Sequence, residues 1–124
     1  MIKLVYCVRK KEELSDEEFR RLWKEKWAPR MAIFARRAGA VRWAQSTTLR
    51  IEANTGLQRV HGLADPFDGV AEVWWEKGTA FQDGNPPQHA MSELEQLREV
   101  GAEMVDYAKS HCFFVEERLG ASEA

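Results

Sequence analysis

Residues 69–76 read GVAEVWWE, a segment rich in the β-branched and aromatic side chains that favour a β-strand. Because successive side chains of a strand point to opposite faces, the apolar residues here separate into two sets. They occupy both faces of the predicted strand, with Ala71, Val73 and Trp75 on one and Val70 and Trp74 on the other. The fold must therefore place apolar surface on both sides of this strand.

Three other segments carry strand signals. Residues 2–8 (IKLVYCV) are a short run of strand formers, residues 40–51 alternate between two faces, and residues 111–119 (HCFFVEERL) form the last predicted strand. Asn, Gly, Asp and Pro turn signals predict a long loop over residues 52–68. The same signals predict a turn-rich connection over residues 77–88.

Two helices are predicted from apolar side chains spaced three and four residues apart. The first begins after a capping box, in which Ser15 and Glu18 satisfy each other's backbone N–H groups. Pro29 lacks an N–H group, so we expect a kink or a break there. Gly39 ends the helical region as a C-cap. The second helix is predicted over residues 89–108.

The predicted order is β-α-β-β-α-β, which is the ferredoxin-like arrangement of an α+β protein. This order predicts a four-stranded antiparallel sheet with both helices on one face. We find no repeat, linker or low-complexity segment, so residues 1–119 form one predicted domain. Residues 120–124 are expected to be a flexible tail.

Two helices on one side leave the other face of the sheet uncovered. Such a face normally meets water and carries polar residues, yet three of the predicted strands have apolar side chains on both faces. We therefore predict that the uncovered face packs against its copy in a two-fold homodimer. The alternative is a monomer in which the predicted loop 52–68 folds over the sheet.

The composition excludes several classes of protein. Among 124 residues, 18 Lys and Arg against 20 Asp and Glu give a net charge of −2, so the positive charge of a nucleic-acid-binding protein is missing. No apolar run approaches the roughly 20 residues that span a membrane. The N-terminal charges follow the apolar stretch, whereas a signal peptide has the reverse order. Cys7 and Cys112 form no disulfide framework, and we expect a cytoplasmic protein.

Motifs that bind nucleotides or metals are also missing from the sequence. There is no GxGxxG, no P-loop, no HExxH and no pair of CxxC motifs. The three His residues are scattered without the spacing of metal ligands. We therefore expect neither a metal nor another cofactor.

Several segments, in this order, resemble the EthD-domain family: MIKLVYCVRKK (1–11), LSDEEFRRLWKEKWAP (14–29), RWAQSTTL (42–49), FDGVAEVWW (67–75) and FFVEE (113–117). The resemblance implies membership of the dimeric α+β barrel superfamily, in which two ferredoxin-like subunits pack sheet to sheet into a dimeric α/β barrel. That superfamily includes small cofactor-free monooxygenases, polyketide cyclases, decarboxylases, lactone isomerases and accessory proteins. Family membership thus implies a fold and a dimer rather than one reaction.

Two positions depart from the family pattern. Many members carry a His just before the Ala-Pro that follows the first-helix Trp, where this chain has Trp27. Many also carry a His after the closing Glu-Glu, where this chain has Arg118. These departures favour a divergent reaction or a binding role.

The resemblance places a ligand pocket between the sheet and the helices, next to the first helix. Such a pocket would suit a small, flat, hydrophobic or aromatic molecule. Its predicted lining consists of aromatic and apolar residues with one amide: Phe19, Leu22, Trp23, Trp27, Trp43, Gln45 and Trp75. The alternative is that the Trp side chains only fill the core and that the amide bonds to the backbone.

Three residues are candidates for catalysis. His89 opens the second helix two residues after Pro87, and some barrel cyclases have a similar Pro-x-His whose His is the general base. Glu72 is either buried with a raised pKa, as a general acid needs, or paired across the dimer, with Arg42 or Arg118 as possible partners. Tyr6 is a candidate phenol donor, with a core position as the alternative.

Two classes of function follow from these residues. The first is a cofactor-independent lyase, cyclase or isomerase acting on a hydrophobic, aromatic or carbonyl-bearing metabolite in a catabolic or biosynthetic pathway, with a cofactor-free monooxygenase as a variant. The second is a non-catalytic ligand-binding or accessory protein of such a pathway.

Overall fold

The computed structural model describes residues 1–76 and 88–120, without the side chains of residues 88 and 89. Most of the predicted turn-rich segment 77–88 and of the predicted tail 120–124 lies outside the described residues. Within the described part of the chain, no helix has the length and apolar character needed to cross a lipid bilayer.

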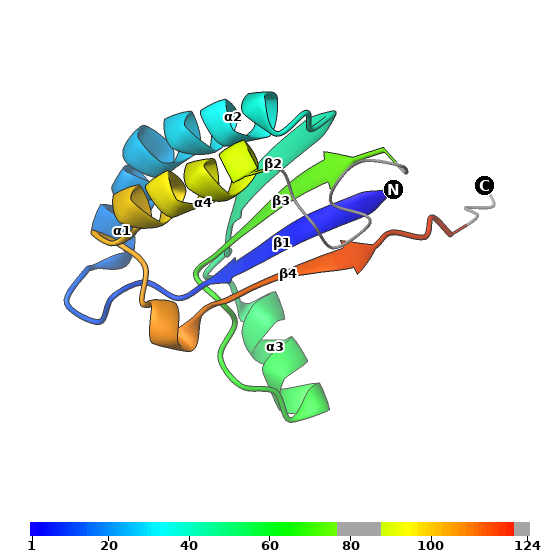
Figure 1. Ribbon diagram of the computed structural model, residues 1–124. Helices are drawn as coiled ribbons and strands as arrows, with labels where there is room; N and C mark the ends of the chain where they lie inside the picture. Colours follow the sequence, from blue (N-terminus) through cyan, green and yellow to red (C-terminus); the bar gives the residue numbers. More distant parts are fainter. Residues whose placement is uncertain (77–87, 121–124) are drawn as a thin grey trace.

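The sheet has four strands, and all its pairings are antiparallel, as predicted. Its spatial order is β2-β3-β1-β4, so β4 and β2 form the edges (Figure 1). The predicted strand 40–51 is shorter than expected, because pairing with β3 ends at Thr47. The strands are β1 (Ile2–Val8), β2 (Arg42–Thr47), β3 (Gly69–Trp75) and β4 (His111–Glu116).

Helices cover one face of this sheet (Figure 1). The first helical region is continuous from residue 16 to residue 37. The second helical region, α4, lies next to it on the same face of the sheet. This arrangement confirms the predicted ferredoxin-like α+β fold. The helices of this layer are α1 (Asp16–Leu22), the π-helical turn η1 (Trp23–Trp27), α2 (Ala28–Arg37) and α4 (Gln88–Gly101).

The predicted interruption near Pro29 takes the form of the π-helical turn η1. The N–H of Ala28 donates to the carbonyl of Trp23, five residues earlier. Since Pro29 has no N–H for the carbonyl of Glu25, a wider turn lets the chain pass the proline without ending the helix. At the far end, Gly39 has φ +73°, which agrees with its predicted role in ending the helical region.

Two predicted boundaries are wrong. Residues 52–68 are not all loop, because they contain the helix α3 (Glu52–His61), which ends at Gly62 in a left-handed cap. The turn formers Asn54 and Gly56 lie inside this helix, which buries none of its residues and so lacked a core pattern. The helix predicted to reach residue 108 ends at Gly101 and is followed by the short 3₁₀ turn η3 (Tyr107–Lys109).

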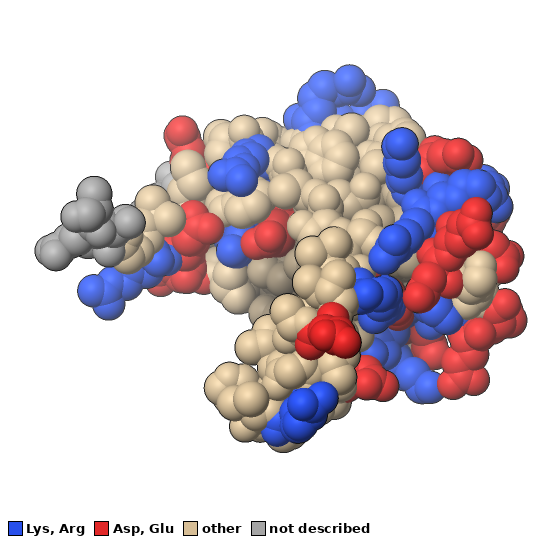
Figure 2. All heavy atoms as spheres, turned by 180° about the vertical axis from the view of Figure 1, so that it is seen from behind, with Lys and Arg blue, Asp and Glu red and all other residues tan. Residues whose placement is uncertain are grey.

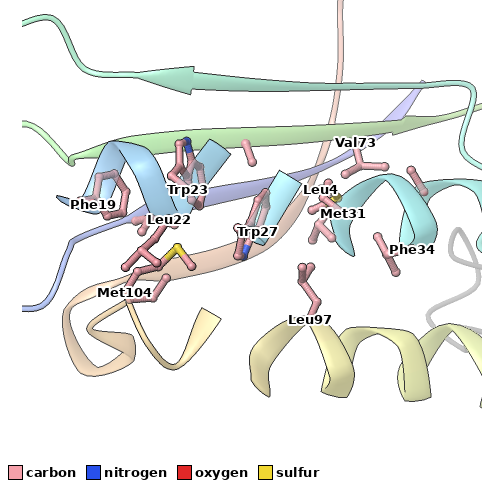
Figure 3. Packing of buried hydrophobic residues seen from close by; sticks show 14 of the residues in the cluster. Leu4, Phe19, Leu22, Trp23, Trp27, Met31, Phe34, Val73, Leu97 and Met104 are labelled. Carbon is pink, nitrogen blue, oxygen red and sulfur yellow. The ribbon is translucent and has the colours of Figure 1, made fainter. Parts of the chain in front are cut away.

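A row of aromatic rings lies between the first helical region and the sheet (Figure 3). The ring centroids of Phe19 and Trp23 are 5.4 Å apart and those of Trp23 and Trp27 are 4.2 Å apart, both nearly parallel. Each of the three side chains is at most 2% exposed. A Cβ at Gly69 would lie 3.1 Å from the Trp23 ring, so the absence of a side chain there lets the row approach β3.

A buried carboxylate joins the two helices of the layer. Glu93 of α4 is only 4% exposed and forms ion pairs with Arg30, at 2.6 Å, and with Arg37, both from α2. The charge of Glu93 is therefore compensated by two guanidinium groups in a place that water scarcely reaches.

Replacing Glu93 by Gln removes the charge that both guanidinium groups face. We expect the free energy of unfolding to fall by about 3 kcal/mol, since breaking a buried pair leaves its partner uncompensated. Glu103→Gln is the matched control, because its pair with Lys26 is half exposed on both sides and should contribute less than about 1 kcal/mol. Urea denaturation measures both changes, and equal losses would contradict this account.

Candidate functional site

A cavity of about 200 Å³ lies between the sheet and α4, on the side of β1 and the edge strand β4. Apolar side chains form most of its wall, and a few polar groups converge on it, as in small-molecule sites. Among the described residues the lining is Tyr6, Val8, Trp27, Leu94, Leu97, Arg98, Val105, Tyr107, Ser110, His111 and Cys112.

Tyr6 brings a hydroxyl group to this cavity from the centre of the sheet. Its ring meets the ring of Trp27 edge to face, with centroids 5.5 Å apart. Its ring lies on the strand position directly opposite Cys112 of β4, whose thiol interacts with the Tyr6 hydroxyl. Burial raises the pKa of Tyr6 far above its ordinary value, so the phenol stays protonated and can donate to a ligand oxygen.

Cys112 is a cavity residue that the sequence analysis did not propose. Burial of its thiol raises the pKa of Cys112 to about 11, so the sulfur is a neutral thiol near pH 7 rather than a nucleophilic thiolate. A thiol is also a weak hydrogen-bonding partner. A ligand oxygen can therefore replace it at the Tyr6 hydroxyl with little loss.

One wall of the cavity depends on a close approach between Tyr107 and the end of α4. The Tyr107 hydroxyl donates to the Arg98 carbonyl at 2.7 Å. A Cβ at Gly101 would lie 2.2 Å from that hydroxyl, so only glycine leaves room for it. The Arg98 guanidinium in turn lies over the Tyr107 ring, 4.7 Å from its centroid.

Most of the residues predicted to line a pocket beside the first helix are packed in the core instead. Phe19, Trp23 and Trp75 are at most 1% exposed, and Leu22 is 7% exposed. The alternative in which aromatic side chains fill the core therefore describes these positions. Trp27 belongs both to the core and to the cavity wall, because it is the last ring of the aromatic row and also lines the cavity.

Two predicted pocket residues of β2 face the helices without reaching the cavity. The Gln45 amide donates to the Trp23 carbonyl at 2.8 Å, the backbone bond named as its alternative. Trp43 is half-buried and packs against the core cluster. Both residues thus support the π-helical turn and the sheet edge.

Glu72 lies on the opposite face of the sheet from Tyr6. Its carboxylate pairs with Lys3 at 2.8 Å, and this hydrogen bond raises the pKa of Lys3. Glu72 therefore has an ionic partner within its own chain, Lys3, which the sequence analysis did not name. Glu72 lies on the same face of β3 as Val70 and Trp74, and the alternation of residues along the strand already indicated this in the sequence.

His89 stands in the first turn of α4. Its side chain lies outside the described residues, so its predicted role as a base stays a prediction. The parts of α4 that line the cavity are Leu94, Leu97 and Arg98, in the second half of the helix.

A wider hollow of about 750 Å³ lies between α3 and the segments that follow β1 and β2. Several of its charged groups form ion pairs with one another. Arg50 pairs with Asp68 and, at 3.4 Å, with Asp16, while Lys109 pairs with Glu12 at 3.0 Å.

Among residues 1–76 and 88–120, no cluster of three His, Cys, Asp or Glu side chains could hold a metal ion. The smaller cavity is therefore the better candidate for a ligand site.

The topology defines the class, a ferredoxin-like α+β domain with a cavity between its sheet and its helices. The family model of the EthD domain matches residues 11–97, and the chain belongs to the EthD-domain family. No curated protein matches the sequence. The matched region contains Trp27 and Leu97 but ends before Tyr107 and Cys112, so part of the cavity wall lies beyond it.

Gly101→Ala should destabilise the protein, although alanine favours helices over glycine by up to about 1 kcal/mol. The new methyl group displaces the Tyr107 hydroxyl, and we expect a loss of about 1–3 kcal/mol in the free energy of unfolding. In a Tyr107→Phe background the conflicting oxygen is gone, so the same substitution should be neutral or stabilising. Chemical denaturation of the four proteins measures this coupling, and additive effects would contradict the proposed contact.

Proposed function

We propose that this protein binds a small aromatic metabolite bearing a carbonyl or hydroxyl group in the cavity between β1, β4 and α4. We further propose that it converts this molecule without a cofactor, in a lyase, cyclase or isomerase reaction. The observation that carries the proposal is the protonated Tyr6 hydroxyl, held beside the Trp27 ring in a mostly apolar cavity.

In this proposal Tyr6 holds the reacting oxygen of the ligand. Negative charge grows on a carbonyl oxygen when a neighbouring C–H is deprotonated, and a fixed neutral donor in an apolar site stabilises that charge. Trp27 packs against the aromatic part of the ligand and fixes its orientation. The remaining apolar wall, including Leu97 and Val105, keeps water away from the oxygen.

The group proposed to move the proton is His89, from the sequence pattern at the start of α4. An imidazole suits this role because its pKa lies near neutrality. A histidine at position 27, which the family resemblance leads one to expect, is replaced by an indole that exchanges no proton near neutral pH.

The alternative function is a non-catalytic ligand-binding or accessory protein. Two observations favour it, the indole of Trp27 and the protonated thiol of Cys112, since neither supplies a base or nucleophile to the cavity. Turnover distinguishes the two functions once a substrate is found by screening aromatic ketones and phenols. His89→Ala should lower that turnover by about 10²- to 10⁴-fold, and oxygen consumption would reveal the monooxygenase variant.

Tyr6→Phe tests the ligand site directly. We expect it to weaken binding of 2-acetylnaphthalene about five- to tenfold, since one neutral hydrogen bond contributes about 0.5–1.5 kcal/mol. Naphthalene, which has no oxygen, should bind both proteins equally. Tyr107→Phe is the control, because that hydroxyl already donates to a backbone carbonyl. Isothermal titration calorimetry measures the affinities, and an unchanged affinity for the ketone in Tyr6→Phe would remove Tyr6 from the site.

We also propose that two copies of the chain pack sheet to sheet. On the uncovered face Phe113 is 46% exposed, Val5 and Val70 are half-buried, and the charge of Glu72 is neutralised by Lys3 of the same chain. Neutralised charges favour a second copy, since like charges then do not oppose each other across a two-fold axis.

The helix α3 extends this apolar surface. It stands on the side of the sheet away from the other helices (Figure 1), and its protruding surface is mostly uncharged (Figure 2). Leu57 is 52% exposed and Val60 is 79% exposed. A helix of 10 residues is marginal by itself in water, so contact with a second copy would stabilise it.

Size-exclusion chromatography with light scattering tests the dimer. We expect the natural protein to have twice the 14.3 kDa mass of one chain at micromolar concentration. Phe113→Glu and Leu57→Glu should each shift it towards the monomer, because each places a charge in the apolar contact. Arg59→Glu, on the same helix but outside the apolar side, should leave the mass unchanged. A monomeric natural protein would contradict the dimer.

A further inference from the structure

Arg98 places a positive charge in the wall of this mostly apolar cavity. It lies in the last turn of α4, and none of the described residues lining the cavity is an Asp or a Glu. No carboxylate of residues 1–76 or 88–120 forms an ion pair with its guanidinium. In contrast, Lys26 and Lys109 are each paired with a Glu.

The guanidinium of Arg98 packs against an aromatic ring of the cavity wall. It lies over the Tyr107 ring, at 4.7 Å from the centroid, and that ring is itself fixed by its bond to the Arg98 carbonyl and by its approach to Gly101. A guanidinium presents several N–H donors in one plane, which match the two oxygens of a carboxylate. The cavity wall therefore carries an anion-binding group that forms no ion pair among the described residues.

We propose that the ligand of this cavity is an aromatic carboxylate of one or two rings, and that Arg98 is the residue that selects it. This inference rests on the proposed ligand site and specifies its substrate class. The carboxylate pairs with Arg98, the rings lie against Trp27 and Leu97, and a second oxygen of the ligand reaches the Tyr6 hydroxyl. The cavity volume of about 200 Å³ suits a molecule of this size.

A pair of probes of nearly equal shape tests the selectivity, namely 2-naphthoate and its neutral amide, 2-naphthamide. We expect the natural protein to bind the carboxylate about tenfold more tightly than the amide, since a hydrogen bond to a charged group is stronger than a neutral one. Arg98→Gln should abolish this preference and leave the affinity for the amide unchanged. Tyr107 bonds to the Arg98 backbone, so the wall stays in place in this variant.

Two further variants complete the experiment. Arg98→Lys should restore part of the preference, since it keeps the charge but loses the planar pair of donors. Arg59→Gln, which removes an equal charge on α3, should leave both affinities unchanged. The preference should also shrink in 1 M salt, because exposed charges are screened there.

The possible failures of the experiment are distinguishable. Equal affinities for the two probes in the natural protein, or a preference that survives in Arg98→Gln, would overturn the role of Arg98 while leaving the ligand site. If the natural protein binds neither probe, the cavity is not a site for aromatic ligands, and the proposed function fails with the inference.

Discussion

The stacking of Phe19, Trp23 and Trp27 is the contact on which the rest of the subunit depends. The three residues follow one another at intervals of four, so their rings lie on one side of the first helical region. Their two stacked contacts each stabilise the fold by about 0.5–1.5 kcal/mol beyond the area that they bury. The π-helical turn keeps this side facing the sheet past Pro29, and Gly69 provides the space on β3.

The same row of rings determines where a ligand can bind. Next to the first helix the aromatic side chains fill the space, and the cavity lies past Trp27, towards β4 and α4. Trp27 thus separates the closed core from the cavity. Around that volume lie a protonated phenol, a neutral thiol and an unpaired guanidinium, a combination suited to holding an oxygen-bearing anion rather than to nucleophilic attack.

The spacing of apolar residues in the sequence was sufficient to predict the fold. Each strand of the sheet and each helix that packs on it buries one regularly spaced set of side chains. The spacing was insufficient for α3, whose apolar side has nothing to cover within the subunit. The alternation of side chains along the strands already placed Tyr6 and Glu72 on opposite faces of the sheet. It could not distinguish a Trp packed in the core from a Trp that lines a cavity. That distinction depends on whether the side chains between the sheet and the helices fill the whole volume there. Arg98 and Cys112 gave no signal, since their importance comes from neighbours distant in sequence.

We propose that the cavity beside Trp27 holds an aromatic anion. A crystal structure of the protein grown with 2-naphthoate tests it most directly. We expect density for the two rings against Trp27 and Leu97, with the carboxylate on the Arg98 guanidinium and no ligand in the polar hollow beside α3. Density only in that hollow, or a cavity closed by the surrounding side chains, would contradict it.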